Sequence, residues 1–103
     1  MKHGHGTAIY TGINGKGHEE YDGDWVDDLM HGFGKYTFTS GGIYTGEWSR
    51  GKMHGKGKML NADGTSYDGD WRDNAMSGEG IYIDIDKVKW EGIFINGSYE
   101  SKI

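Results

Sequence analysis

The sequence predicts an all-β protein: an elongated, twisted, single antiparallel meander of about nine strands. Three observations predict this fold. A 23-residue repeat runs in register from Tyr21 to the end of the chain. Within each repeat, side chains alternate with the two-residue period of a strand, and short dipeptides of turn-forming residues separate the alternating segments. No segment has the periodicity of a helix.

The composition narrows the class of protein. The chain has 103 residues, of which 20 are Gly and none is Pro or Cys, with 34% hydrophobic and 14% aromatic residues. So many aromatic residues indicate a folded chain, not a solvated tail. Without Cys, disulfide frameworks, cysteine zinc sites and thiol catalysis are excluded. The longest apolar run is only a few residues, so a cytoplasmic protein is the default expectation. A net charge of −5 argues against nucleic acid, or an anionic membrane, as the main partner.

The repeat organises the whole chain as a single domain, 1–103. Its parts are a half repeat (1–20), three repeats (21–43, 44–66 and 67–89) and a truncated repeat (90–103). Each full repeat opens with Y-x-G-x-W and continues with G-x-G. In the first two full repeats a His comes directly before this G-x-G. Ser77 replaces that His in the third, and Trp90 and Phe94 replace Tyr and Trp in the truncated repeat.

The Y-x-G-x-W core followed by H-G-x-G resembles the MORN (membrane occupation and recognition nexus) repeat. The resemblance covers nearly all of the chain, and the short length resembles that of the small MORN-only proteins of cilia and sperm flagella. It implies 23-residue hairpin repeats and an interaction module without catalytic activity.

Two kinds of connection set the expected register. A two-residue type I′ turn follows each Trp or its counterpart, because its second residue is always Gly, Asn or Asp. These turns are Asp27-Asp28, Arg50-Gly51, Asp73-Asn74 and Asn96-Gly97. Such a turn predicts Trp48 opposite Met53, Gly46 opposite Gly55 and Tyr44 opposite Gly57.

Three-residue loops ending in Gly41 and Gly64 are expected to keep the aromatic face on one side. They predict Tyr36 opposite Tyr44 and Met59 opposite Tyr67. The first connection is longer, and Asn14-Gly15 predicts a projecting hairpin at about 9–20 that places Ala8 opposite Tyr21.

One face of this sheet is predicted to carry the motif Tyr and Trp rings, with each Met of the second strand across from a Trp. Twelve glycines fall in the same lattice, and the rings are expected to lie over them and form the core; an aromatic groove for carbohydrate or peptide is the alternative. The twelve are Gly4, Gly6, Gly23, Gly32, Gly34, Gly46, Gly55, Gly57, Gly69, Gly78, Gly80 and Gly92.

The opposite face is predicted to carry the acidic side chains at the x positions of Y-x-G-x-W. The register gives them cross-strand partners, which favours a solvated structural face over a calcium or glycosidase site. The expected pairs are Lys58 with Asp68, Lys56 with Asp70, His54 with Glu47, and Lys102 with Glu91.

Three residues of that face form the one candidate metal site. The predicted register puts His5 and His31 on either side of Asp24, in three neighbouring strands about 4.8 Å apart. Two His and a carboxylate are a known ligand set. The alternative, which we favour, is two histidines hydrogen-bonded to a carboxylate, and therefore neither a metal nor another cofactor is expected.

A basic cluster lies in residues 50–58 and contains Arg50, Lys52, Lys56 and Lys58. The family resemblance suggests phosphoinositide headgroups, whose phosphates Lys and Arg bind. Two of these lysines already have predicted Asp partners, so anionic-lipid binding is kept as the alternative function.

Ile81, Ile83, Ile93 and Ile95 are predicted to lie on the face that is polar elsewhere. Contiguous exposed apolar residues usually mark an interface, and a strand at about 98–103 is expected to form a free edge that docks a partner or a second copy. A local cap is the alternative.

The sequence has no P-loop, no G-x-S-x-G and no H-E-x-x-H, so a non-catalytic scaffold or adaptor is the predicted function. The resemblance implies protein partners in a cytoskeletal assembly such as a ciliary or flagellar axoneme. The alternatives are the peripheral lipid-binding module and an accessory domain for an enzyme in the same complex.

Overall fold

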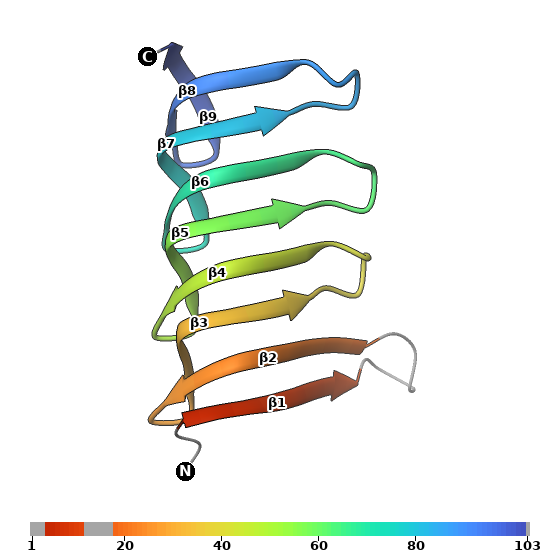
Figure 1. The fold of residues 1–103 in the computed structure, drawn as a ribbon, viewed down its shortest axis with the longest axis vertical. Helices are drawn as coiled ribbons and strands as arrows, with labels where there is room; N and C mark the ends of the chain where they lie inside the picture. The colour runs from red at the N-terminus through yellow and green to blue at the C-terminus, as the bar shows by residue number, and fades with distance from the viewer. Residues whose placement is uncertain (1–3, 12–17, 103) are drawn as a thin grey trace.

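The computed structural model describes residues 4–11 and 18–102, and these residues form one open sheet of nine antiparallel strands in chain order (Figure 1). The prediction of a single all-β antiparallel meander is therefore confirmed, and no helix occurs among the described residues. The strands are β1 (Gly4–Thr11), β2 (His18–Val26), β3 (Leu29–Thr37), β4 (Ile43–Ser49), β5 (Lys52–Leu60), β6 (Ser66–Arg72), β7 (Ala75–Ile83), β8 (Lys89–Ile95) and β9 (Ser98–Lys102).

The sheet is elongated along the direction in which the strands stack. The molecule measures 43 × 28 × 17 Å, and β1 and β9 lie at opposite ends of the long axis (Figure 1). All extensive strand contacts join consecutive strands, so the stability of the protein is approximately a sum of repeat and nearest-neighbour terms. In the part of the chain that the structure describes, no helix could span a membrane.

The type I′ turns form where the sequence places them. Both turn residues have positive φ, at 51° and 66° for Asp27 and Asp28 and at 48° and 71° for Asp73 and Asn74. Asp and Asn tolerate this left-handed region better than most residues because of their short polar side chains. These turns connect β2 to β3 and β6 to β7, and equivalent turns connect β4 to β5 and β8 to β9.

The register across the three-residue loops is also as predicted. Tyr36 pairs with Tyr44, and Met59 pairs with Tyr67. At the first connection Ala8 pairs with Tyr21, and the β1–β2 ladder continues to its last pair, Thr11 with His18. The tip of the predicted hairpin, residues 12–17, lies outside the described residues.

The register inside each repeat differs from the prediction. Trp48 pairs with Met53 as expected, but Gly46 pairs with Gly57, not Gly55, and Tyr44 pairs with Met59, not Gly57. Between the Trp and Gly pairs, one residue of β4 faces three residues of β5. A β-bulge absorbs the two additional residues, and the same irregularity occurs between β2 and β3 and between β6 and β7.

An acidic side chain holds the bulge in each of these three strand pairs. The carboxylate of Glu47 accepts a hydrogen bond from the backbone N–H of Lys56, directly after Gly55, whose φ is +84°. The distances from N to carboxylate oxygen in the equivalent bonds are 3.1 Å for Phe33 to Asp24 and 3.0 Å for Glu79 to Asp70. The second x of Y-x-G-x-W is therefore acidic because it satisfies a backbone donor that the bulge removes from the ladder.

The bulge also corrects our reading of three glycines. A Cβ on Gly55 would meet the carboxylate of Glu47 at 2.5 Å, and Gly32 and Gly78 similarly face Asp24 and Asp70. Positive φ and a carboxylate therefore require glycine at these three positions, and the prediction that aromatic rings cover them is wrong.

Rings do cover the second glycine of each G-x-G. A Cβ on Gly57 would overlap the hydroxyl and ring carbons of Tyr44, and Gly34 and Gly80 lie in the same way beneath Tyr21 and Tyr67. Each tyrosine is thereby packed flat against the sheet and is almost completely buried. The sheet makes its core in this way without a second layer.

The rings form one continuous column. Tyr44 contacts Trp48 of its own repeat and Trp71 of the next repeat, edge to face, with ring centroids 5.2 Å apart in both pairs. Tyr21 and Tyr67 are likewise each held between two rings. Edge-to-face pairs of this kind contribute roughly 0.5 to 1.5 kcal/mol beyond area burial, so the column couples each repeat to its neighbour.

Hydrogen bonds fix the orientation of these rings. The Tyr44 hydroxyl donates to the carbonyl of Glu47 at 2.8 Å, and the Trp48 indole donates to the carbonyl of Gly34 at 3.1 Å. Burial raises the pKa of the Tyr21 and Tyr67 hydroxyls to about 12. Among the described residues no buried side-chain polar atom lacks a partner.

Candidate functional site

The C-terminal end of the aromatic column is built differently from the rest. Phe94 takes the motif Trp position and is 2% exposed because it packs against Tyr67 of the preceding repeat. Trp90 takes the motif Tyr position but is 44% exposed, whereas Tyr44 is 0% exposed. Both substitutions retain an aromatic ring, and the difference in exposure comes from the neighbours.

A loop carboxylate holds the Trp90 indole at the surface. The indole N–H donates to Asp84 Oδ2 at 2.9 Å, and the other oxygen of Asp84 accepts the N–H of Asp86 and of Val88. These hydrogen bonds lower the pKa of Asp84 below its ordinary value, and the bond from Trp90 has the largest effect. Trp90 is therefore held in one orientation although nearly half of it is exposed.

Tyr99, which replaces the motif Met, packs beside Trp90 and Phe94 with ring centroids 5.4 Å apart in each pair. A hollow of about 330 Å³ opens next to these rings. It is lined by Met76, Tyr82, Trp90, Phe94, Gly97 and Tyr99. Our sequence reasoning did not identify this surface; the signals were the Tyr-to-Trp and Met-to-Tyr exchanges in the truncated repeat.

The structure places the four predicted isoleucines on the outer face of β7 and β8, interleaved with charged residues. Ile81 pairs with Asp68 and Glu91, and Ile93 pairs with Glu79. Ile95 is 50% exposed, whereas Ile81, Ile83 and Ile93 are partly buried. They form a diagonal apolar stripe on a polar background.

The basic cluster divides into two parts. Lys56 forms an ion pair with Asp70, which raises the pKa of Lys56, and Lys58 pairs with Asp68 across the strands as predicted. Arg50 and Lys52 instead line a separate hollow of about 440 Å³ near the turns. The other residues of this hollow are His31, Ser49, His54 and Asp73.

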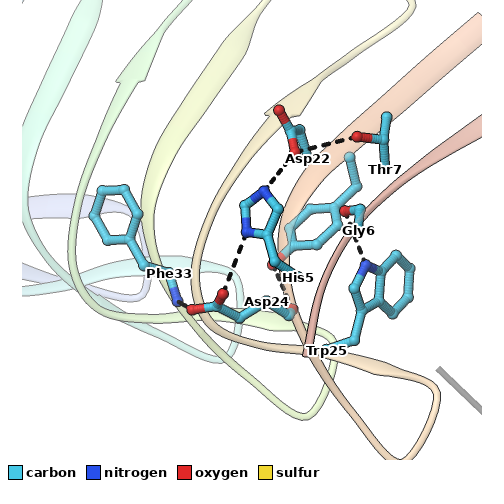
Figure 2. Close-up of polar contacts among 8 residues, drawn as sticks. His5, Gly6, Thr7, Asp22, Asp24, Trp25 and Phe33 are labelled. Carbon is cyan, nitrogen blue, oxygen red and sulfur yellow. Dashed lines mark hydrogen bonds and ion pairs between the residues drawn. The ribbon is translucent and has the colours of Figure 1, made fainter. Parts of the chain in front are cut away.

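The structure brings His5 and Asp24 together but not His31, and Figure 2 shows His5 beside Asp24 and Asp22. His5 lies between two carboxylates, with Nε2 3.0 Å from Asp22 and Nδ1 3.4 Å from Asp24. His31 Nδ1 instead accepts the backbone N–H of Arg50 at 3.3 Å. Over residues 4–11 and 18–102, no group of three or more acidic or His side chains is arranged to hold a metal ion.

The other hydrogen bonds of Asp22 and Asp24 show what these two carboxylates beside His5 do. Asp24 also accepts the N–H of Phe33 at the first bulge, and Asp22 accepts the Thr7 hydroxyl at 3.2 Å (Figure 2). Asp22 therefore ties β1 to β2, and Asp24 ties both β1 and β3 to β2, so both carboxylates have a structural role. The register differs from two further predictions: the bulge removes His54 from its place opposite Glu47, and Lys102 stands opposite Gly92, not Glu91.

The sheet, its bulges and its ring column together define a class: an open β-meander repeat protein whose repeats are hairpins. A sequence model of the MORN repeat matches residues 21–43, 44–66 and 67–87. The chain therefore belongs to the MORN repeat family, whose repeats are generally non-catalytic modules that interact with proteins or membranes. No curated protein matches the chain significantly.

Proposed function

We propose that this chain is a non-catalytic scaffold or adaptor that binds other proteins in a cytoskeletal assembly, such as the axoneme of a cilium or flagellum. The observation that carries the binding proposal is the apolar stripe on the outer face of the last repeats. Ile81 and Ile93 lie among strand positions that carry Asp, Glu and Lys in the earlier repeats, and Ile95 exposes half of its surface. An apolar stripe in a polar surface is what a protein partner buries. The cytoskeletal assignment rests on the resemblance to small MORN-only ciliary proteins.

Affinity purification from ciliated cells tests this proposal. The tagged chain is compared with a variant carrying Ile93→Ser and Ile95→Ser, and Phe33→Ser is the matched control because Phe33 is also apolar and 58% exposed. We expect axonemal proteins with the native chain and the control, and their loss with the double variant. Equal recovery with the double variant would reject the isoleucine stripe as the docking surface. Recovery without any cytoskeletal protein would reject the cytoskeletal assignment.

A second candidate function is peripheral binding to anionic lipid headgroups. The observation that favours it is the hollow where Arg50 and Lys52 lie beside His31 and His54. Neither Arg50 nor Lys52 takes part in the Lys56–Asp70 ion pair. Lys52→Glu should abolish flotation with phosphoinositide-containing vesicles at physiological salt, whereas Lys56→Glu should have little effect. If the native chain does not float with these vesicles, this candidate is removed.

A further inference from the structure

The isoleucine stripe of β7 and β8 runs between two acidic side chains on opposite sides of it. Ile81 stands opposite Glu91, and Ile93 stands opposite Glu79. Both glutamates are exposed, and neither forms an ion pair with any side chain that the structure describes. Elsewhere on this face, by contrast, Lys56 neutralises a carboxylate of β6. The stripe is therefore an apolar surface flanked by negative charge that the described side chains leave unpaired.

Both strands beneath the stripe are interior strands of the described sheet. β7 pairs with β6 and β8, and β8 pairs with β7 and β9. An extended segment laid over this face would therefore press its own N–H and C=O groups against isoleucine side chains, which offer them no hydrogen bonds. A helix satisfies its backbone hydrogen bonds internally. A helix is therefore the form of partner that this surface fits.

The stripe has the length of a short helix. Ile83 stands opposite Lys89, and Ile95 lies six residues further along β8, so the stripe is about 20 Å long. A helix of about 14 residues has this length, since it rises about 1.5 Å per residue. Apolar residues spaced by three and four positions on such a helix form one stripe that can face the isoleucines.

The two glutamates also decide which surface can face the stripe. In a two-fold contact each copy contributes the same patch, so two copies of this chain would bring their unpaired glutamates together. Like charges disfavour that contact, and they disfavour anionic lipid headgroups for the same reason. The complementary surface instead has Lys or Arg beside its apolar residues.

We propose that the isoleucine stripe binds an amphipathic helix of another protein, and that Lys or Arg side chains of this helix pair with Glu79 and Glu91. The isoleucines supply the buried apolar area, and the two charges fix the orientation of the helix and exclude acidic helices. The inference rests on the proposed function, because it specifies the partner of the same surface.

A synthetic helix tests the proposal on the 103-residue chain. The probe is a fluorescein-labelled peptide of about 18 residues, built from Ala, with Leu at alternating spacings of three and four residues and Lys on both flanks of the Leu stripe. One control peptide has Glu in place of each Lys, and another has Ala in place of each Leu. Fluorescence anisotropy at physiological salt should show saturable binding of the probe and at least tenfold weaker binding of both controls. Equal affinity for the Lys and Glu peptides, or no saturable binding of the probe, would overturn the proposal.

Charge reversal in the chain tests the role of the two glutamates. Glu79→Lys with Glu91→Lys should weaken binding of the probe at least tenfold. The matched control is Asp27→Lys with Asp73→Lys, which changes the net charge equally at two turns outside the stripe. Arg50 occupies the equivalent turn position with a similar positive φ, so a basic residue is tolerated there. The control should change the affinity less than twofold, and equal weakening by both pairs would show that only the net charge attracts the probe and would reject the proposal.

Amide NMR shifts of the native chain locate the probe without depending on any variant. We expect the shifts in β7 and β8, and shifts confined to the acidic strand β2 would contradict the proposal. If the chain alone forms a dimer that Ile93→Ser with Ile95→Ser dissociates, the stripe is assigned to a second copy and the helix inference is rejected.

Affinity purification from ciliated cells separates this inference from the proposed function. The chain with Glu79→Lys and Glu91→Lys should lose the same partners as the chain with Ile93→Ser and Ile95→Ser. If only the isoleucine variant loses them, the proposed function stands and the basic-helix inference is rejected. If neither variant loses them, the stripe is rejected as the docking surface and the inference is rejected with it.

Discussion

The repeat at residues 44–66 and the truncated repeat at 90–103 both form a hairpin with the same type of turn, but among the described residues the first repeat has strands on both sides and the second pairs only with the preceding repeat. Tyr44 is 0% exposed beneath the ring of the next repeat, whereas Trp90 at the same position is 44% exposed. Phe94 is nevertheless buried, because the ring that covers it belongs to the preceding repeat. The difference shows that the ring of the following repeat buries the first motif ring of each full repeat.

The bulges differ between these two repeats as well. Glu47 caps the bulge at Gly55 in the first, whereas Ile93 and Ser101 occupy the equivalent positions in the last. There the register shifts between Ile93 and Phe94, with a single additional residue of β9, Glu100, between the two pairs. The truncated repeat has therefore lost the acidic cap and has gained an outward apolar side chain in its place.

The largest expected effect comes from removing the buried ring. Tyr44→Ala should lower the free energy of unfolding by about 4 kcal/mol, because it removes a large side chain that two rings and the sheet enclose. Trp90→Ala, the equivalent change in the truncated repeat, should cost less than about 1.5 kcal/mol, since much of Trp90 is already in water. Urea unfolding of both variants measures the difference. Equal losses would show that the truncated repeat is packed like the others.

The glycine beneath the ring gives the next largest effect. Gly57→Ala should cost about 3 kcal/mol, at the upper end of the overpacking range, because its Cβ would overlap Tyr44. Gly6→Ala is the matched control: Gly6 has the same motif position, but its Cβ would meet only Trp25, at an ordinary 3.5 Å. The control should change stability by less than about 0.5 kcal/mol. Similar losses in both variants would contradict the packing of the ring on the glycine.

Alkaline pH should weaken the full repeats through their tyrosines. Burial raises the pKa of Tyr21 and Tyr67 from 10.0 to about 12, so the unfolded chain loses these protons first. Stability is therefore fully present below pH 10 and falls as pH rises towards 12, by roughly 2 kcal/mol for each of the two residues. Trp90, at the same position of the truncated repeat, has no such proton to lose. Thermal unfolding measured at a series of pH values, together with the absorbance of tyrosinate, checks this loss of stability. A melting temperature that stays constant up to pH 12 would refute the prediction.

The smallest effect concerns the acidic cap. Asp70→Ala should cost about 1 kcal/mol, because it leaves the N–H of Glu79 without its carboxylate acceptor at the bulge. Glu91→Ala, at the first x position of the truncated repeat, should change stability by less than about 0.5 kcal/mol. Hydrogen exchange of the Glu79 amide provides a local readout and should accelerate only in the Asp70 variant. Unchanged exchange would show that the cap is dispensable.

Much of this architecture follows from local chemistry, and that part was predictable. Dipeptides such as Asp27-Asp28 place the turns, and the even spacing of Tyr44, Gly46 and Trp48 places them on one face. The Lys56–Asp70 pair was predicted because it lies across the regular, unbulged side of the repeat. The register error for Gly46 came from extending strict alternation through a position where Gly55 adopts positive φ.

The candidate site was predictable only in part. Strand parity put Ile81 and Ile93 on the outer face, which needs no knowledge of distant contacts. The surface at Trp90 and Tyr99 was not predicted, because both are aromatic residues at positions that the repeat normally buries. Their exposure depends on a ring that the preceding repeats receive from the next strand.

The sequence by itself determined the strands, their turns, the two faces and the membership in the MORN repeat family, because these depend on residues close together in the chain. Only the tertiary structure decided where Glu47 and its equivalents direct their carboxylates, which glycine each ring covers, and why His31 does not join His5 and Asp24. It also decided that Trp90 is held at the surface by Asp84. These outcomes depend on which atoms approach one another across a bulged ladder, and these atoms belong to residues far apart in the chain.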